Sequence, residues 1–280
     1  MPFRRSRFGA YPPLPSSKVD WTDPLATGLI HAWPLTDGGG LYGRNLIAKG
    51  ADMALTATPP TWTSWKRSGK QLSFNGSNNA LSVALNLTSY NKLSVSFWGV
   101  NTTNGSGDNM FMEFTPNMFG ATLGGFMIDP NSGGFPGTVE MACKSTLAAG
   151  IFVDVTFPQP TAAVWNHWAV VYDYTISGVG KIVAVYINGI AQTLTTRFGT
   201  DTTTTGTFAN STLYVMSRGA ASLWNTGYMQ DIRMWSRTLT QSEVWQLYST
   251  PWRPFAPQKI GLPRAPASSF FPRVVRWRNA

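Results

Sequence analysis

The chain has 280 residues, long enough for one large core, and its 12 Trp, 16 Phe and 9 Tyr side chains can fill the space between two sheets. A single cysteine, Cys143, excludes an internal disulfide and a cysteine-based zinc site, and we expect its side chain to be buried in the strand 139–143. The net charge of +9 comes from the two ends, because residues 19–250 carry 12 basic and 13 acidic side chains.

Short apolar segments separated by turn residues predict an all-β domain. They lie at 28–35, 72–77, 93–98, 165–173, 185–189 and 227–235. In 93–98 apolar and polar residues alternate with period two, which predicts a strand with one buried face and one solvated face. The pair Asn188-Gly189 is typical of a type I′ turn and predicts a hairpin there.

One helix is predicted near the end of the domain. Thr240 and Glu243 have the spacing of a capping box, in which each side chain binds the backbone N–H of the other residue. Val244 and Leu247 follow on one face, and Pro251 blocks continuation after about two turns.

Both ends are basic, contain no acidic residue and are rich in proline and aromatic residues. We therefore predict extended arms at 1–20 and 251–280, which flank a domain at 21–250 and dock on an external surface. The docking residues would be Arg4, Arg5, Arg7, Trp252, Arg253, Phe255, Phe270, Phe271, Arg273, Arg276, Trp277 and Arg278. Solvated tails are one alternative. Nucleic-acid binding is another, and it is disfavoured because the arginines are dispersed between prolines.

In their order and spacing the six apolar segments resemble the laminin-G-like, concanavalin-A-like family of jelly-roll sandwiches. The resemblance implies a two-sheet antiparallel jelly roll over 21–250, with the short helix closing the last strand against the sandwich. Residues 1–8 are basic but no apolar stretch follows them, so we expect no secretory signal peptide. No run of about 18 apolar residues predicts a membrane span either.

Lectin-like sandwiches usually work outside cells, and a bacteriophage protein reaches the exterior by lysis without a signal peptide. The resemblance therefore predicts a virion protein made in the host cytoplasm and displayed on the particle. It would attach through its arms to other virion proteins in a symmetric assembly, as capsid decoration or cement. The alternative is a glycan-binding adhesin of a tail or fibre.

Catalysis is not expected. A glycosidase needs two carboxylates held about 5 to 10 Å apart. On one face of a strand such a pair usually appears as two acidic residues separated by one residue, and the sequence contains no Glu-x-Asp or Glu-x-Glu. The glutamates are Glu113, Glu140 and Glu243. His31 and His167, the two histidines, lie close to tryptophans in segments predicted to be core, so packing roles are expected for both.

Calcium and glycan sites are implied more weakly. In the family, a calcium ligand often precedes the Gly of a Phe-x-Gly turn and another lies in the last strand, which would select Asn75 and Asp231. Asn75 is uncharged, which weakens affinity for calcium. No other cofactor is expected. Candidate glycan contacts are Trp62, Trp65, Trp224 and Asn225.

Overall fold

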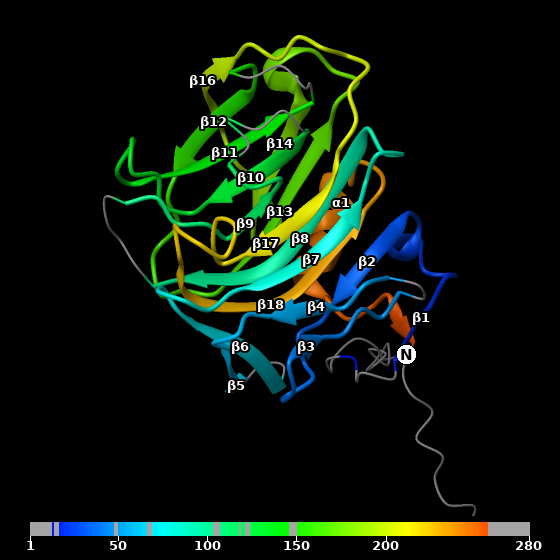
Figure 1. The fold of residues 1–280 in the computed structure, drawn as a ribbon. Coiled ribbons are helices and arrows are strands. Elements are labelled where there is room, and N and C mark those ends of the chain that lie inside the picture. The colour runs from blue at the N-terminus through cyan, green and yellow to red at the C-terminus, as the bar shows by residue number, and fades with distance from the viewer. Residues whose placement is uncertain are drawn as a thin grey trace, which may run out of the picture.

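The computed structural model describes residues 13, 17–47, 50–65, 69–102, 107–117, 119–120, 124–145 and 150–256. Two antiparallel sheets face each other and form a jelly-roll sandwich (Figure 1). This is the fold class that the sequence predicts.

One sheet has nine strands and the other has eight. In spatial order the first contains β16 (Thr195–Gly199), β12 (Val153–Pro158), β11 (Thr138–Lys144), β10 (Gly125–Asp129), β9 (Met112–Phe114), β17 (Asn210–Val215), β7 (Leu81–Asn86), β4 (Met53–Leu55) and β3 (Tyr42–Gly43). The second contains β15 (Ile190–Ala191), β14 (Ile182–Ile187), β13 (Asn166–Asp173), β8 (Lys92–Asn101), β18 (Thr226–Trp235), β6 (Gly69–Asn75) and β5 (Thr61–Trp65), with β2 (Leu29–Trp33) paired to β18.

The remaining elements are few. β1 (Lys18–Val19) pairs with β19 (Phe255–Ala256), two short 3-10 helices span Pro24–Ala26 (η1) and Gly178–Lys181 (η2), and one α-helix, α1, spans Gln241–Ser249. Across the described ranges, no helix is both long and apolar enough to cross a bilayer.

The main core lies between the two sheets and is rich in aromatic rings. Phe97 from β8 stacks on Trp168 from β13 at a centroid distance of 6.0 Å, and Phe111 meets both rings edge-on. The predicted hairpin is confirmed, because Asn188 and Gly189 have φ angles of 54° and 78° between β14 and β15. Cys143 is buried in β11, also as predicted.

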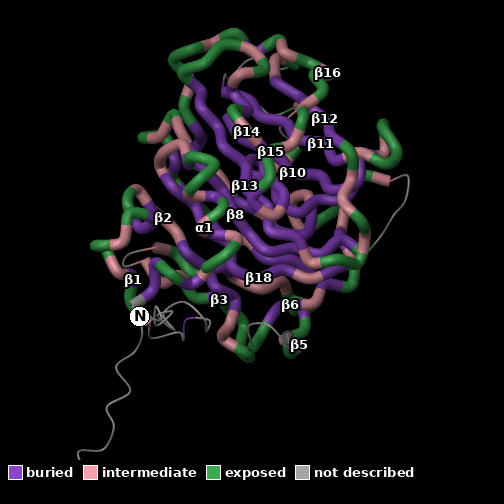
Figure 2. Tube along the Cα trace, turned by 180° about the vertical axis from the view of Figure 1, so that it is seen from behind, coloured by how far each residue is buried: buried purple, intermediate pink, exposed green. Residues whose placement is uncertain are grey.

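The outer face of the eight-stranded sheet is covered, so the expectation of a solvated face on 93–98 is wrong. Ser94 and Ser96 on β8 are 0% and 2% exposed. A second apolar cluster lies over this face, in which Val244 and Leu247 of α1 are buried together with Trp235. Figure 2 shows β8, β13 and β18 as continuous buried strands.

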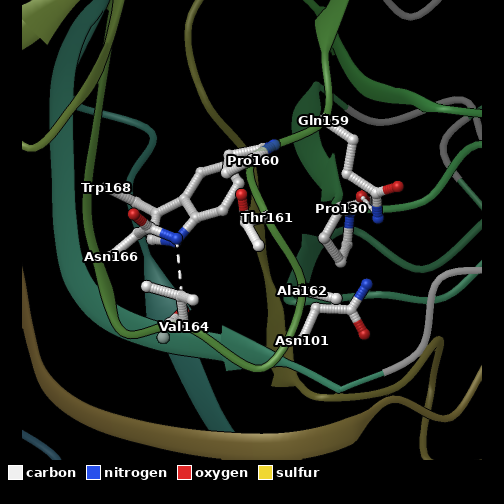
Figure 3. A pocket seen from close by; sticks show the side chains of 10 residues that line it. Asn101, Pro130, Gln159, Pro160, Thr161, Ala162, Val164, Asn166 and Trp168 are labelled. Atoms are coloured by element: carbon white, nitrogen blue, oxygen red, sulfur yellow. Dashed lines mark hydrogen bonds between the residues drawn. The ribbon is translucent and has the colours of Figure 1, made fainter.

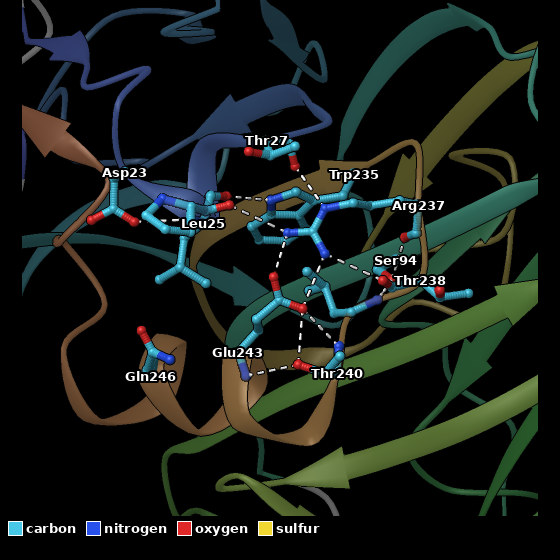
Figure 4. A network of polar contacts seen from close by, with 12 residues as sticks. Asp23, Leu25, Thr27, Ser94, Trp235, Arg237, Thr238, Thr240, Glu243 and Gln246 are labelled. Carbon is cyan, nitrogen blue, oxygen red and sulfur yellow. Dashed lines mark hydrogen bonds and ion pairs between the residues drawn. The ribbon is translucent and has the colours of Figure 1, made fainter.

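The start of α1 is fixed by the predicted capping box (Figure 4). The Thr240 hydroxyl accepts from the Glu243 amide at 3.3 Å, and the Thr240 amide donates to the Glu243 carboxylate at 2.9 Å. Arg237 adds an ion pair to Glu243 at 2.6 Å and donates to the Thr27 carbonyl at 2.7 Å. These bonds join the helix to the N-terminal part of the domain.

The ends of the domain differ from the prediction. Because β1 pairs with β19, the folded unit extends beyond 21–250 on both sides. Trp252 and Phe255 are only 4% and 6% exposed, since their own domain covers them, so neither needs an external surface. Arg253 is bonded to Asp23 at 2.7 Å. The other predicted docking residues lie outside the described residues: Arg4, Arg5, Arg7, Phe270, Phe271, Arg273, Arg276, Trp277 and Arg278.

Candidate functional site

A cleft of about 260 Å³ opens in the loop between β2 and β3. It is lined by Asp37, Gly39, Gly40, Leu41, Tyr42 and Arg44. β3 is the edge strand of the nine-stranded sheet and β5 is the edge strand of the other, and both lie at the same end of the molecule (Figures 1 and 2). The cleft therefore lies where the edges of the two sheets meet.

Glycines give this loop its shape. Gly38 and Gly40 have φ angles of 76° and 87°, a conformation that side-chain-bearing residues rarely adopt. A Cβ added at Gly39 or Gly40 would have no neighbouring atom within 4 Å, so the backbone there is open to a ligand. Trp62 from β5 holds the loop from the other sheet, because its indole N–H donates to the Gly40 carbonyl at 3.1 Å.

The cleft is lined by an exposed aromatic residue and by a pair of oppositely charged groups. Tyr42 is 57% exposed and Leu41 is 60% exposed. Burial raises the pKa of Asp37, whose side chain is 10% exposed, whereas the Arg44 side chain is 65% exposed and its Nε lies 3.9 Å from Asp37 Oδ1. The site thus combines an apolar platform with a hydrogen-bond acceptor and a charged donor.

The predicted glycan residues are only partly at this cleft. Trp62 is beside it but half-buried, and its N–H is occupied by Gly40. The Trp65 side chain lies outside the described residues. Trp224 is half-buried before β18 and does not line the cleft. Asn225 is 0% exposed, so the prediction that it contacts a glycan is wrong.

The residues that line the cleft were not predicted from the sequence. The available signal was the run Asp37-Gly38-Gly39-Gly40 directly before two large apolar residues, Leu41 and Tyr42. Such a glycine run holds an open loop, and apolar side chains beside it have little structure to cover them.

The calcium ligands that the resemblance implies do not come together. Asp231 is 4% exposed, and both of its carboxylate oxygens bind Arg233 at 2.7 Å. Asn75 pairs with Thr226 at the start of β18, five residues before Asp231. Among the residues described, no group of three or more His, Cys, Asp or Glu side chains is arranged to hold a metal ion. Arg233 therefore engages both carboxylate oxygens of Asp231.

Asn75 instead organises its own turn. Its side-chain oxygen accepts from the amides of Ser77 and Asn78 at 3.0 and 3.3 Å, and its amide group donates to the Asn78 side chain at 2.8 Å. The side-chain oxygen of Asn79 accepts a hydrogen bond from the backbone N–H of Asn75 at 3.0 Å. These asparagines therefore close the β6–β7 connection by local hydrogen bonds.

Two carboxylates do meet, across neighbouring strands. Glu140 of β11 and Asp154 of β12 bind the same Arg197 nitrogen at 2.9 and 3.1 Å, and burial together with the charge of Glu140 raises the pKa of Asp154. Phe135 lies 3.8 Å from the guanidinium of Arg197. The carboxyl groups are 10% and 2% exposed, so they form a covered ionic link between β11, β12 and β16.

Both histidines pack against aromatic rings. His31 stacks on Trp33 at 4.9 Å, and burial lowers its pKa to about 4. His167 is 2% exposed beside Trp98, and burial followed by the charge of Arg233 lowers its pKa to about 3. Both rings are therefore neutral at pH 7.

A second hollow lies beneath the segment that precedes β13 (Figure 3). It is lined by Gly99, Asn101, Pro130, Gln159, Pro160, Thr161, Ala162, Val164, Asn166 and Trp168. Its volume of about 10 Å³ is enough for one water molecule and too small for a sugar ring.

Comparison with protein families matches residues 74–245, more than half of the chain, to the concanavalin A-like lectin/glucanases superfamily. The chain belongs to this superfamily. The matched segment of the superfamily begins after the cleft loop and includes most of both sheets. A search of the curated proteins finds no match to this sequence.

Solved structures share the superfamily fold at low identity. The binding domain of Paraclostridial Mosquitocidal Protein 1 is 14% identical with a TM-score of 0.60, over 80% of this chain and 52% of that chain. Domain 4 of AbnA, an extracellular arabinanase from Geobacillus stearothermophilus in complex with arabinotriose, is 18% identical with a TM-score of 0.56, over 79% and 98% of the two chains.

The botulinum neurotoxin serotype D ligand binding domain, in complex with N-acetylneuraminic acid, is 11% identical with a TM-score of 0.55, over 79% of this chain and 50% of that chain. This chain thus spans about half the length of the toxin domains that it matches. At these identities the likeness shows the fold alone.

Proposed function

We propose that this domain is a non-enzymatic glycan-binding module and that the cleft formed by residues 37–44, in the β2–β3 loop and β3, is its ligand site. The observation that carries the proposal is Tyr42, which is 57% exposed and lines an open cleft together with Asp37 and Arg44. An exposed ring packs against the apolar face of a sugar, while polar groups around it bind the hydroxyls. The arabinotriose and N-acetylneuraminic acid complexes of similarly folded proteins support this choice of ligand class.

Binding is favoured over hydrolysis by the state of the carboxylates. A glycosidase presents one carboxylic acid and one carboxylate to the scissile bond. Glu140 and Asp154 are instead covered, and Arg197 binds both of them. Asp37 is the carboxylate in the open cleft, and its neighbour there is a guanidinium.

A glycan array followed by calorimetry tests the proposed site. Tyr42→Ala removes the platform and should lower affinity for the array's best ligand about tenfold, equivalent to about 1.4 kcal/mol. Its melting temperature should stay close to wild type, because the ring is exposed. The matched control is Phe198→Ala, which removes a ring that is 45% exposed on β16, the opposite edge of the nine-stranded sheet. Equal loss in both variants, or none in Tyr42→Ala, would contradict the proposal.

The setting of the module is a further part of the proposal. We keep the sequence-based prediction of a bacteriophage virion protein, made in the host cytoplasm, and favour the adhesin reading over capsid decoration because the domain has an open cleft. The attachment arms are shorter than first predicted, since residues 251–256 belong to the domain. Gold-labelled antibody should then mark the tail or fibre of imaged particles, and capsid labelling would favour decoration instead.

A further inference from the structure

The N-terminal segment passes directly beside the cleft. The Thr36 hydroxyl donates to the carbonyl of Pro13 at 2.8 Å, and the next residue, Asp37, lines the cleft. Residues 1–12, which precede this contact, carry Arg4, Arg5 and Arg7 and no acidic residue. The sequence that precedes Pro13 is therefore basic.

The two ends of the domain are paired with each other. Lys18 is paired with Ala256 in the antiparallel β1–β19 ladder (Figure 1). Residues 257–280 carry five basic side chains and no acidic one. Together, residues 1–12 and 257–280 hold eight of the nine net positive charges of the protein.

The cleft has accessible cations of its own. The Arg44 side chain is 65% exposed, and its 3.9 Å contact with Asp37 is a long ion pair that solvent weakens. Lys70 on β6 is exposed, and its stem lies against Gly38, where an added Cβ would be 3.2 Å from Lys70 Cγ. Lys70 Nζ donates to the Ser64 hydroxyl at 3.3 Å, a neutral partner. Two available cations thus border the loop that carries Tyr42.

We propose that the ligand of this cleft is an acidic glycan, whose sugars bear carboxylate, sulfate or phosphate groups. This inference rests on the proposed function. The Arg44 guanidinium offers the paired N–H groups that bind such anions, and Lys70 adds a point charge. The net charge of +9 attracts a polyanion and speeds its encounter with the protein. Tyr42 packs against the sugar ring.

The test uses the full chain and pairs of probes that differ only in charge. Sialyllactose and oligogalacturonate are each compared with their carboxyl methyl esters, at ionic strengths of about 0.01 M and about 1 M, where the screening length falls from about 30 to about 3 Å. The acidic members should bind about tenfold tighter at low salt, a difference of about 1.4 kcal/mol, and this preference should shrink at high salt.

Variants locate the effect. Arg44→Gln should remove most of the acidic preference, because it should weaken the binding of acidic members more than that of neutral members, whereas the control Lys92→Gln should leave both unchanged. Lys92 is a cation outside the cleft, with a 43% exposed side chain, and it pairs with Asp173 at 2.9 Å at the start of β8. Replacing Arg4, Arg5 and Arg7 with Gln should slow association with the acidic members and leave the neutral members unchanged.

The outcomes separate this inference from the proposed function. Equal binding of acidic and neutral members overturns the acidic-ligand inference and leaves glycan binding standing. A single-stranded oligonucleotide that binds as tightly as the acidic glycans, with no effect of Tyr42→Ala, also overturns it and favours nucleic acid. Binding of no carbohydrate at either salt concentration overturns both.

Discussion

His167 shows how burial sets the protonation state of a residue in this protein. Its ring lies between Trp98 of β8 and Tyr248 of α1, at centroid distances of 5.3 and 6.3 Å. Burial and the charge of Arg233 lower its pKa to about 3, so the folded protein holds the neutral ring. The unfolded chain takes up a proton on this residue below about pH 6.5.

The free energy of unfolding should therefore decrease as the pH falls below about 6.5, because protons bind the unfolded state in preference to the folded one. For His167 the expected loss is about 3 kcal/mol between about pH 6.5 and about pH 4. Burial raises the pKa of Asp231 to about 6, so this residue has the opposite effect on stability. Its protonated form stabilises the folded state at low pH, and this stabilisation is lost as the pH rises through about 6.

Urea melts across this pH range, compared between wild type and His167→Phe, isolate the histidine contribution. Phe keeps an aromatic ring in the site and cannot take up a proton. The variant should show a flatter dependence of stability on pH. An unchanged slope would mean that His167 is protonated in the folded state.

The residues of the candidate site were the hardest to predict from the sequence. The sequence indicated tryptophans, because these rings most often contact sugars, but Asn225 is buried and the Trp62 N–H is bonded to Gly40. The exposure of Tyr42 depends on how the edges of the two sheets pack against each other. The periodicity of a single strand does not predict that packing. The glycine run at 38–40 was the local signal for the open loop.

At the scale of the elements, periodicity and capping predicted most of the fold. The alternation in 93–98 located β8, and Thr240 and Glu243 located the start of α1. Contacts between elements were not predictable in this way. In the register of β11 and β12, Ala142 lies opposite Asp154, so Glu140, two residues from Ala142 on the same face, is a diagonal neighbour of Asp154. The spacing of acidic residues along one strand cannot reveal such a contact between strands.

The capping box gives a prediction at this scale. Glu243→Ala removes the bond to the Thr240 amide and the ion pair with Arg237, and it should lower stability by about 1 to 2 kcal/mol. Glu243→Gln keeps an acceptor for the amide and should cost less. Urea unfolding measures the stability of both variants. Equal losses of stability would show that the hydrogen bond to the Thr240 amide contributes nothing beyond the charge of Glu243.

At the scale of the whole molecule, the two ends of the chain close the domain together. Val19, Trp252 and Phe255 are buried in the cluster over the outer face of the eight-stranded sheet, and Arg233 lies 4.8 Å from the ring of Phe255. A proline-rich aromatic segment has the same sequence pattern whether its own domain or a partner protein covers its rings. For that reason the domain boundary predicted from the sequence, at residue 250, lies inside the folded unit.

Truncation tests this boundary. A protein of residues 17–256 should unfold cooperatively with the stability of the full chain, because it keeps the β1–β19 ladder. A protein of residues 21–250 should be less stable by at least about 3 kcal/mol, since it loses buried Trp252 and Phe255. If both proteins show equal midpoints in urea, the ladder and these two rings do not contribute to the domain.

The central claim is that the cleft formed by residues 37–44 binds a glycan. The most direct measurement is a titration of the ¹⁵N-labelled protein with the best ligand of the array, followed by amide NMR shifts. The account predicts that the shifts concentrate at residues 37–44 and at the indole N–H of Trp62, which is bonded to the cleft loop. Shifts centred on Glu140, Asp154 and Arg197, with residues 37–44 unchanged, would contradict it.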